Sequence, residues 1–264
     1  MPALIISRLF VKSKKIGLAL SGGAARGMAH LGVVKALYEK DIRIGCIAGT
    51  SSGAIAGAFI ADGYDPEEIL EIVMKKKIIT YLRFALAKPG LLTMIRIRKI
   101  LEQHLRARRF EDLKIPLYVT CTNLNSGQAE YFHEGEIIDK IIASSSIPGL
   151  FAPVEINGSI YADGGILDNL PVKAIKDKCK RVIGVDVNYT GPEEKIVSAI
   201  AVIERSFHLS IRAKVEEKAK LCDLFIDPDE LRDYGLTDLG RGREMFDIGY
   251  RKAMELLEET KVLN

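Results

Sequence analysis

Two stretches near the start of the chain each pass from an apolar segment through a loop of small residues into a helical pattern. The first is KIGLALS (residues 15–21), which precedes a glycine-containing loop and apolar residues at helical spacing from Met28. The second is IGCIAGT (residues 44–50), which leads into a helical pattern over residues 52–61. Alternation of this kind favours a parallel sheet with helices on both faces. We therefore predict an α/β fold, a three-layer sandwich around a mostly parallel central sheet.

The rest of the chain continues this pattern without an internal repeat or a low-complexity linker. We predict further strands in IPLYVTCTN, RVIGVDVN and DLFIDP, and further helices over residues 199–220 and 242–260. With 264 residues, 48% of them hydrophobic, the chain can bury a sizeable core. We predict one domain over residues 1–264, with a basic helical insertion at about residues 80–112.

The sequence carries no sign of export or of a membrane span. Its longest apolar stretches are shorter than the roughly 18 residues that a transmembrane helix needs, and its first residues lack a long apolar region with a cleavage site. Its four cysteines lie far apart without a C-x-x-C pair, which predicts neither a disulfide framework nor a zinc site. We expect a cytoplasmic protein, with at most peripheral contact with the inner face of the membrane.

Basic residues are concentrated in one segment. Residues 75–109 contain eleven Lys and Arg against one acidic residue, Glu102, and the first fifteen residues add four more basic residues. This asymmetry indicates an anionic partner, either nucleic acid or a lipid surface. No nucleic-acid motif accompanies it, whereas Leu, Ile, Phe and Met alternate with the charges as in an interfacial helix. We expect contact with an anionic membrane surface; a lid and a solvated face packed on the core stay open as alternatives.

The two loops differ in the chemistry that they predict. Gly49-Thr50-Ser51-Ser52-Gly53 is a G-x-S-x-G, the strand-to-helix elbow of a nucleophilic serine, although such a pattern also makes a tight turn. The loop at residues 22–27 places unpaired N–H groups at a helix N-terminus, which suits an anion. It matches neither the dinucleotide fingerprint nor the P-loop. Together the loops favour an oxyanion hole beside a nucleophile.

A serine needs a base, and the sequence offers few. Of the four histidines, His30 falls within the first helix, while His104 and His133 lie at positions typical of the surface. His208 follows the order of the α/β-hydrolase triad but sits within a long helical pattern. Asp163 is better placed, because it ends a short predicted strand and two glycines follow it, which lets a carboxylate approach another loop closely.

With these features the chain resembles the patatin-like phospholipases. The resemblance rests on four blocks in order, which are Gly22-Gly23-Ala24-Ala25-Arg26-Gly27 with His30 and Gly32, Gly49-Thr50-Ser51-Ser52-Gly53, ASSSIPGLFAPV (residues 143–154) and Asp163-Gly164-Gly165. The blocks are similar to the oxyanion loop, the nucleophile elbow, an intermediate stretch and the dyad aspartate of that family. The segment at residues 75–109 matches no block of the family.

The resemblance implies an acyl hydrolase that cleaves lipid esters with a Ser–Asp dyad. Ser51 would be the nucleophile and Asp163 its base, and the chemistry needs no metal or organic cofactor. Arg26 and Ser52 would support the loop or contact the substrate. The oxyanion hole would consist of the N–H groups of Gly22, Gly23 and Ala24. The alternative from another class is a regulatory or lipid-binding protein that retains the fold.

Overall fold

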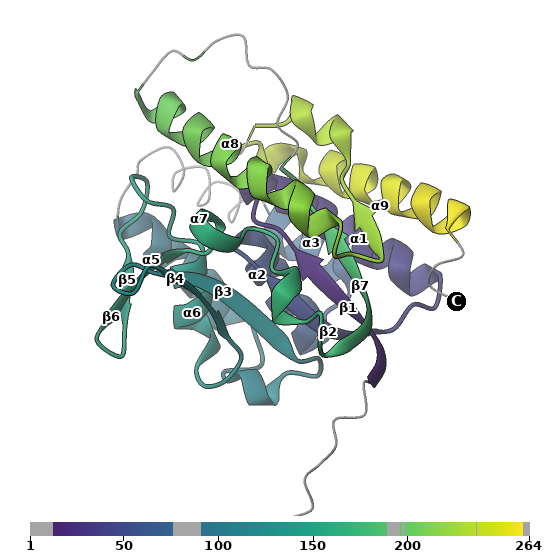
Figure 1. Cartoon of the computed structure of the whole chain (residues 1–264), viewed down its shortest axis with the longest axis horizontal. Helices are drawn as coiled ribbons and strands as arrows, with labels where there is room; N and C mark the ends of the chain where they lie inside the picture. The colour runs from purple at the N-terminus through teal and green to yellow at the C-terminus, as the bar shows by residue number, and fades with distance from the viewer. Residues whose placement is uncertain (1–12, 76–90, 189–195, 197–198, 236, 261–264) are drawn as a thin grey trace, which may run out of the picture.

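The computed structural model describes residues 13–75, 91–188, 196, 199–235 and 237–260. Within those residues a mixed sheet of eight strands forms the centre of the molecule (Figure 1), in the order β5-β6-β3-β2-β1-β7-β8 with β4 paired to β3. The strands are β1 (Ser13–Leu20), β2 (Ile44–Gly49), β3 (Leu117–Asn123), β4 (Gln128–Phe132), β5 (Val154–Ile156), β6 (Ser159–Asp163), β7 (Cys179–Val185) and β8 (Leu224–Ile226).

Five adjacent strands of the sheet are parallel, and the others are antiparallel. The pairs β3–β2, β2–β1, β1–β7 and β7–β8 are parallel, whereas β4 and β6 run antiparallel to β3, and β5 to β6. In β1, Leu18 and Leu20 are fully buried on one face and Ala19 on the other, as expected for a parallel strand covered on both sides. The predicted α/β fold with a central sheet is confirmed.

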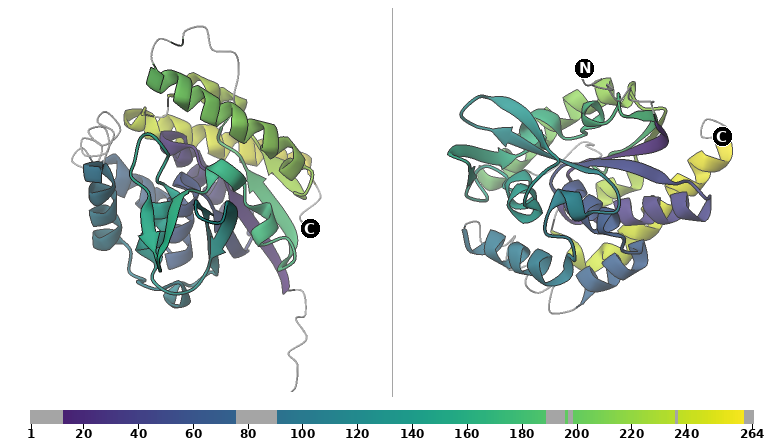
Figure 2. Two further views of the ribbon diagram at one scale, coloured as in Figure 1. Left: turned by 60° about the vertical axis from the view of Figure 1, so that its left-hand side comes forward. Right: turned by 90° about the horizontal axis from the view of Figure 1, so that it is seen from below.

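Helices cover both faces of this sheet. Buried apolar side chains form two clusters, one shared by the sheet with α1, α2, α3, α5, α6 and α9, the other shared with α8 and the segment before β7, so the molecule has three layers (Figures 1 and 2). None of the described helices is both long and apolar enough to cross a bilayer. The α-helices are α1 (Met28–Glu39), α2 (Ser52–Asp62), α3 (Pro66–Met74), α5 (Leu91–His104), α6 (Ile137–Ser144), α7 (Gly165–Asp168), α8 (Ala199–Ala219) and α9 (Gly242–Glu259). The 3-10 helices are η1 (Ala24–Gly27), η2 (Phe110–Asp112), η3 (Val172–Ala174), η4 (Asp229–Asp233) and η5 (Leu239–Arg241).

The basic insertion expected at residues 80–112 contains α5 and η2, and its residues 80–90 lie outside the described part of the chain. The apolar side of α5 packs inward, because Met94 and Leu101 are 6% and 1% exposed and belong to the core. One of its basic residues, Arg98, forms an ion pair of 2.5 Å with Asp139. For this helix the packing matches the alternative in which the apolar face covers the protein's own core.

Helices α1 and α9 approach each other so closely that one contact point has no room for a side chain. A Cβ on Gly32 would lie 1.9 Å from the carbonyl oxygen of Phe246 and 2.7 Å from the backbone nitrogen of Tyr250. Both are backbone atoms of α9, which cannot move aside as the end of a flexible side chain can. The glycine that the sequence places in the first helix therefore serves the packing of these two helices.

We predict that Gly32→Ala lowers the free energy of unfolding by about 1–3 kcal/mol or more, since overpacking forces α9 away from α1. Urea unfolding gives the measurement. Gly57→Ala in α2 is the matched control, because its Cβ would meet only side-chain atoms, the nearest being Ile47 Cγ2 at 3.0 Å, and it gains about 1 kcal/mol in helix propensity. Equal stability of the two variants would contradict this account of the helix contact.

Candidate active site

Ser51 occupies a strained elbow between β2 and α2. Its φ of 53° and ψ of −120° are uncommon for a residue with a side chain. The flanking glycines permit this turn: a Cβ on Gly49 would lie 2.4 Å from the carbonyl oxygen of Gly53, and a Cβ on Gly53 would lie 2.4 Å from that of Leu20. The G-x-S-x-G pattern is thus required by the close packing of β1, β2 and α2 around the serine.

The backbone of Ser51 is held by a residue from a distant part of the chain. The Ser51 N–H donates to Ser144 Oγ at 2.9 Å, and Ser144 Oγ donates to the Thr120 carbonyl at 2.7 Å. Ser144 ends α6 and Thr120 lies in β3. The block at residues 143–154 therefore acts on the elbow through hydrogen bonds. The sequence pattern did not predict this role of Ser144.

Asp163 reaches Ser51 because β2 and β6 share one edge of β3. Gly49 at the end of β2 pairs with Val119, Asp163 at the end of β6 pairs with Cys121, and β4 occupies the other edge of β3 over the same residues. The antiparallel β6 thus runs toward the carboxyl end of β2. Two residues far apart in the sequence meet where these two strands end.

The carboxyl group of Asp163 is almost completely enclosed. It is 2% exposed, its Oδ1 accepts from the Gly165 N–H at 2.7 Å, and its Oδ2 has no hydrogen-bond partner among the described residues. Burial raises the pKa of Asp163 to about 7, against the hydrogen bond from Gly165 and the neighbouring Ser51 hydroxyl, which both favour the charged form. The group is therefore a base suited to neutral pH.

The glycine loop that follows β1 lies beside the serine. A Cβ on Gly22 would lie 3.0 Å from Ser51 Cβ. The Gly22 N–H donates to Asn169 Oδ1 at 3.2 Å, whereas the N–H groups of Gly23 and Ala24 find no acceptor within the described residues. Of the three amides expected to form an oxyanion hole, Gly22 is thus engaged by Asn169, and the other two remain available.

Ser52 carries a fourth backbone N–H beside the serine, in addition to those of the glycine loop. As the first residue of α2 its N–H has no intrahelical partner, and no other described residue accepts from it. In serine hydrolases with this elbow the residue after the nucleophile supplies an oxyanion donor. The Ser52 hydroxyl is also buried without a hydrogen-bond partner in the described part of the molecule. Arg26 was predicted, like Ser52, to support the loop or contact the substrate. Its Nε donates to the Tyr234 carbonyl at 2.7 Å, a contact that braces the loop.

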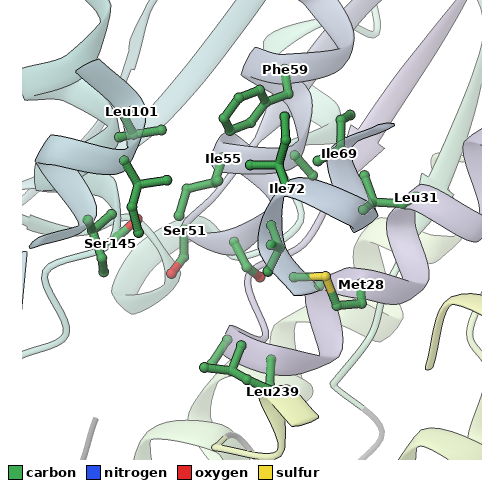
Figure 3. A pocket seen from close by; sticks show the side chains of 18 of the residues that line it. Met28, Leu31, Ser51, Ile55, Phe59, Ile69, Ile72, Leu101, Ser145 and Leu239 are labelled. Carbon is green, nitrogen blue, oxygen red and sulfur yellow. The ribbon is translucent and has the colours of Figure 1, made fainter. Parts of the chain in front are cut away.

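An apolar cavity of about 150 Å³ opens beside Ser51 (Figure 3). Its walls come from α1, α2, α3 and α5 and from the residues after α6, and nearly all of the lining side chains are hydrocarbon. Ile55 and Phe59 project from α2, and Leu101 from α5. A cavity of this size and chemistry accommodates an apolar group in preference to water.

None of the histidines whose side chains are described lines this cavity or hydrogen-bonds to Ser51 or Asp163. His30 is buried with Nε2 2.8 Å from the Ser21 carbonyl, and burial lowers its pKa to about 4. His104 ends α5, and His133 stacks on Tyr118. His208 lies within α8, and its side chain is outside the described set. The described residues also contain no cluster of acidic, His and Cys side chains that could hold a metal.

Comparison with known proteins gives one family. Residues 18–175 match the family model described as patatin-like phospholipase. The lysophospholipase NTE1 of Kluyveromyces lactis is 29% identical over an alignment of 289 residues that covers 96% of this chain and 20% of the relative. An uncharacterized NTE family protein of Mycobacterium bovis is 36% identical over 165 residues, 62% of this chain and 46% of the relative. The chain spans less than half the length of these curated relatives.

One solved structure supports the fold. The crystal structure of VipD from Legionella pneumophila superposes with a TM-score of 0.56 at 15% sequence identity, over 94% of this chain and 67% of VipD. The shared fold contains the sheet and the flanking helices described above.

We predict that Asp163→Asn stabilises the protein and that the gain grows with pH. The unfolded carboxyl ionises near its ordinary pKa of 3.8 and the folded one only near 7, so the wild type loses stability as pH rises between these values. The difference in the free energy of unfolding between variant and wild type should increase by up to about 4 kcal/mol from about pH 4 to about pH 8. Urea unfolding at several pH values measures it.

Two comparisons isolate the Asp163 contribution. His30 also changes its pKa on folding, but it is present in both proteins, and its effect cancels in the difference. Ser51→Ala retains the carboxyl group and should lose stability with rising pH at least as strongly as the wild type, because the Ser51 hydroxyl that lowers the pKa of Asp163 is gone. A stability difference between Asp163→Asn and wild type that is independent of pH would show that the carboxyl is not held protonated by burial.

Proposed function

Since this chain belongs to the patatin-like phospholipase family, we propose that it is a serine acyl hydrolase that cleaves lipid esters through Ser51 and Asp163. The observation that carries the proposal is the placement of a serine on a strained elbow beside a buried carboxyl group whose Oδ2 is left without a partner among the described residues. A carboxylate in this position is the base that a serine hydroxyl requires.

The reaction proceeds in two acyl transfers. Asp163 accepts the proton of Ser51 Oγ as the oxygen attacks the ester carbonyl carbon, and the N–H groups of Gly23, Ala24 and Ser52 stabilise the oxyanion that forms. The carbon–oxygen bond to the alcohol then breaks, and the alcohol leaves with the proton from Asp163. Water then attacks the acyl carbon and gives a proton to Asp163. The bond from this carbon to Ser51 Oγ breaks, Oγ takes the proton back from Asp163, and the carboxylic acid is released.

The apolar cavity supports a lipid as the substrate. It begins at Ser51 and is lined by aliphatic and aromatic side chains, so an acyl chain bound there is removed from water while its carbonyl carbon lies beside the nucleophile. Burial of each methylene group contributes about 0.8 kcal/mol. Binding energy from the chain would thereby position the ester for attack.

We also propose that the protein acts in the cytoplasm and contacts anionic membrane surfaces peripherally. Support comes from the basic segment at residues 75–109 and not from the apolar side of α5, since Met94 and Leu101 of that helix are already buried in the core. Among the described basic residues Arg98 is paired with Asp139. Attraction to anionic lipid would rest on charge, which salt screens.

Ser51→Ala and Asp163→Asn should each reduce kcat/KM for p-nitrophenyl ester hydrolysis close to background, and the double variant should be little worse. The losses are non-additive because nucleophile and base act as one unit. In the wild type, activity should rise as pH increases through about 7, because Asp163 must be ionised to accept the proton. His208→Ala should retain most activity, with circular dichroism as the folding control for every variant.

Labelling with a fluorophosphonate tests the alternative class. A hydrolase is labelled at Ser51, whereas a lipid-binding or regulatory protein that retains the fold is not. A folded His208→Ala variant without activity, or an active Asp163→Asn variant, would replace the dyad by a histidine-dependent mechanism.

For the membrane proposal, sedimentation with vesicles is the measurement. Binding should increase with the fraction of anionic lipid and decrease with salt, since each basic residue near an anionic surface contributes about 1 kcal/mol before screening. Equal partitioning to neutral and anionic vesicles at low salt would rule out an electrostatic contact.

A further inference from the structure

We infer that Asn188 orients the Gly22–Gly23 peptide so that its N–H faces the site, which makes Asn188 a positioning residue of the oxyanion hole. The residue lies beyond residues 18–175, the part that matches the family model. The inference rests on the proposed function, because it concerns how the same site stabilises the oxyanion.

Two side chains bind the carbonyl oxygen of this peptide. The Gly22 carbonyl accepts from Asn188 Nδ2 and from Ser21 Oγ, the latter at 2.9 Å. A trans peptide directs its carbonyl and its N–H in opposite directions, and the described chain contains no cis peptide. The N–H of Gly23 therefore points away from Asn188 and Ser21, and it finds no acceptor among the described residues.

This peptide needs to be held because both of its residues are glycines. Without Cβ atoms, rotation of the whole peptide group meets little steric resistance. A flipped peptide would present its carbonyl oxygen to the tetrahedral intermediate and repel the negative charge. Asn169 restrains the preceding peptide by accepting from the Gly22 N–H at 3.2 Å, so the two asparagines hold Gly22 from both sides.

Asn188 reaches the loop because β7 and β1 are parallel neighbours. Leu20 at the end of β1 pairs with Val185 at the end of β7, so the segments that follow both strands lie at the same edge of the sheet. The Val187 N–H donates to Ser21 Oγ at 3.0 Å. This hydrogen bond joins the two segments at the residue directly before Asn188. Asn188 itself is 2% exposed.

A buried charge network fixes the Asn188 side chain. Its backbone N–H and its Nδ2 both donate to Asp186 Oδ1 at 3.3 Å. Because Nδ2 contacts two groups that only accept, the carboxylate and the Gly22 carbonyl, the amide has one possible orientation.

Asp186 in turn is held from α8. It is fully buried, and its Oδ2 pairs with Arg212 at 3.0 Å, while the same guanidinium contacts Asp227 at 2.8 Å. A buried carboxylate is costly unless it is paired. Arg212 compensates the Asp186 charge that orients Asn188, and so links α8 to the glycine loop.

The test compares Asn188→Ala and Asn188→Leu with the wild type in ester hydrolysis. Both variants lose the donor to the Gly22 carbonyl, and leucine does so with a side chain of nearly the same shape and no charge beside Asp186. We expect kcat to fall about 10- to 100-fold, less than the roughly 10²- to 10³-fold cost of deleting a whole donor, with KM within about threefold. Asp223→Asn is the matched control. Asp223 accepts from the N–H of Val182 at 2.8 Å, which lies in β7, the strand that precedes Asn188, but Asp223 lies away from the glycine loop.

An alkyl boronic acid gives a second readout that a loss of stability would not produce. Ser51 Oγ donates an electron pair to boron and gives its proton to Asp163, no group leaves, and one of the two hydroxyl oxygens on the tetrahedral boron takes the place of the oxyanion. Its affinity should fall by the same factor as kcat in both Asn188 variants, while an alcohol of the same chain length binds as tightly as it does to the wild type.

Unchanged kcat and boronic acid affinity in folded Asn188 variants would overturn the inference while the proposed function stands. Losses in kcat that merely follow thermal stability, and that Asp223→Asn reproduces, would also overturn it. A wild-type chain that neither hydrolyses esters nor binds the boronic acid would contradict the proposed function and the inference together.

Discussion

The incomplete hydrogen bonding of one buried carboxyl group makes that group basic at neutral pH, and the proposed chemistry depends on this. A carboxylate that accepts two or three hydrogen bonds from fixed N–H donors becomes a weaker base, because those bonds stabilise the ion and lower its pKa. Asp163 has one such donor on Oδ1, and its Oδ2 has none among the described residues. Burial without full compensation makes the ion unfavourable in the folded protein, and that same instability makes the carboxylate a stronger base, as the proposed proton transfer from Ser51 requires.

The sheet topology places this group where it is useful. Three strands of the parallel part end at one edge and deliver the glycine loop, the Ser51 elbow and Asn188, from β1, β2 and β7. The antiparallel β6 approaches along the same edge of β3 as β2, so its last residue faces the elbow directly. A fully parallel sheet would carry Asp163 alongside the elbow or away from it. The mixed topology is therefore part of the site.

Local residue patterns were sufficient to predict the parallel core, and they singled out Ser51 and Asp163, which the fold brings close together. Glycines around Ser51 and after Asp163 mark positions where backbones approach each other, and that requirement is visible in a short stretch of sequence. The residues that hold the elbow and the glycine loop in place are not visible in a short stretch of sequence. Ser144, Asn169 and Asn188 act through single hydrogen bonds across the fold, and polar residues after strands or helices are common. The inward packing of α5 was equally hidden, because an amphipathic helix has the same pattern on a membrane as on a core.

The cavity and the reacting groups belong to different parts of the architecture. Strand ends and their loops carry the proposed reacting groups, whereas part of the cavity wall consists of side chains on α3 and α5, helices that hold none of those groups. A change of residue on those helices alters which chains fit without moving Ser51 or Asp163. For the proposed hydrolase, exchanging one aliphatic side chain of these helices for another would change which acyl chains are preferred and leave the proposed nucleophile and base in place.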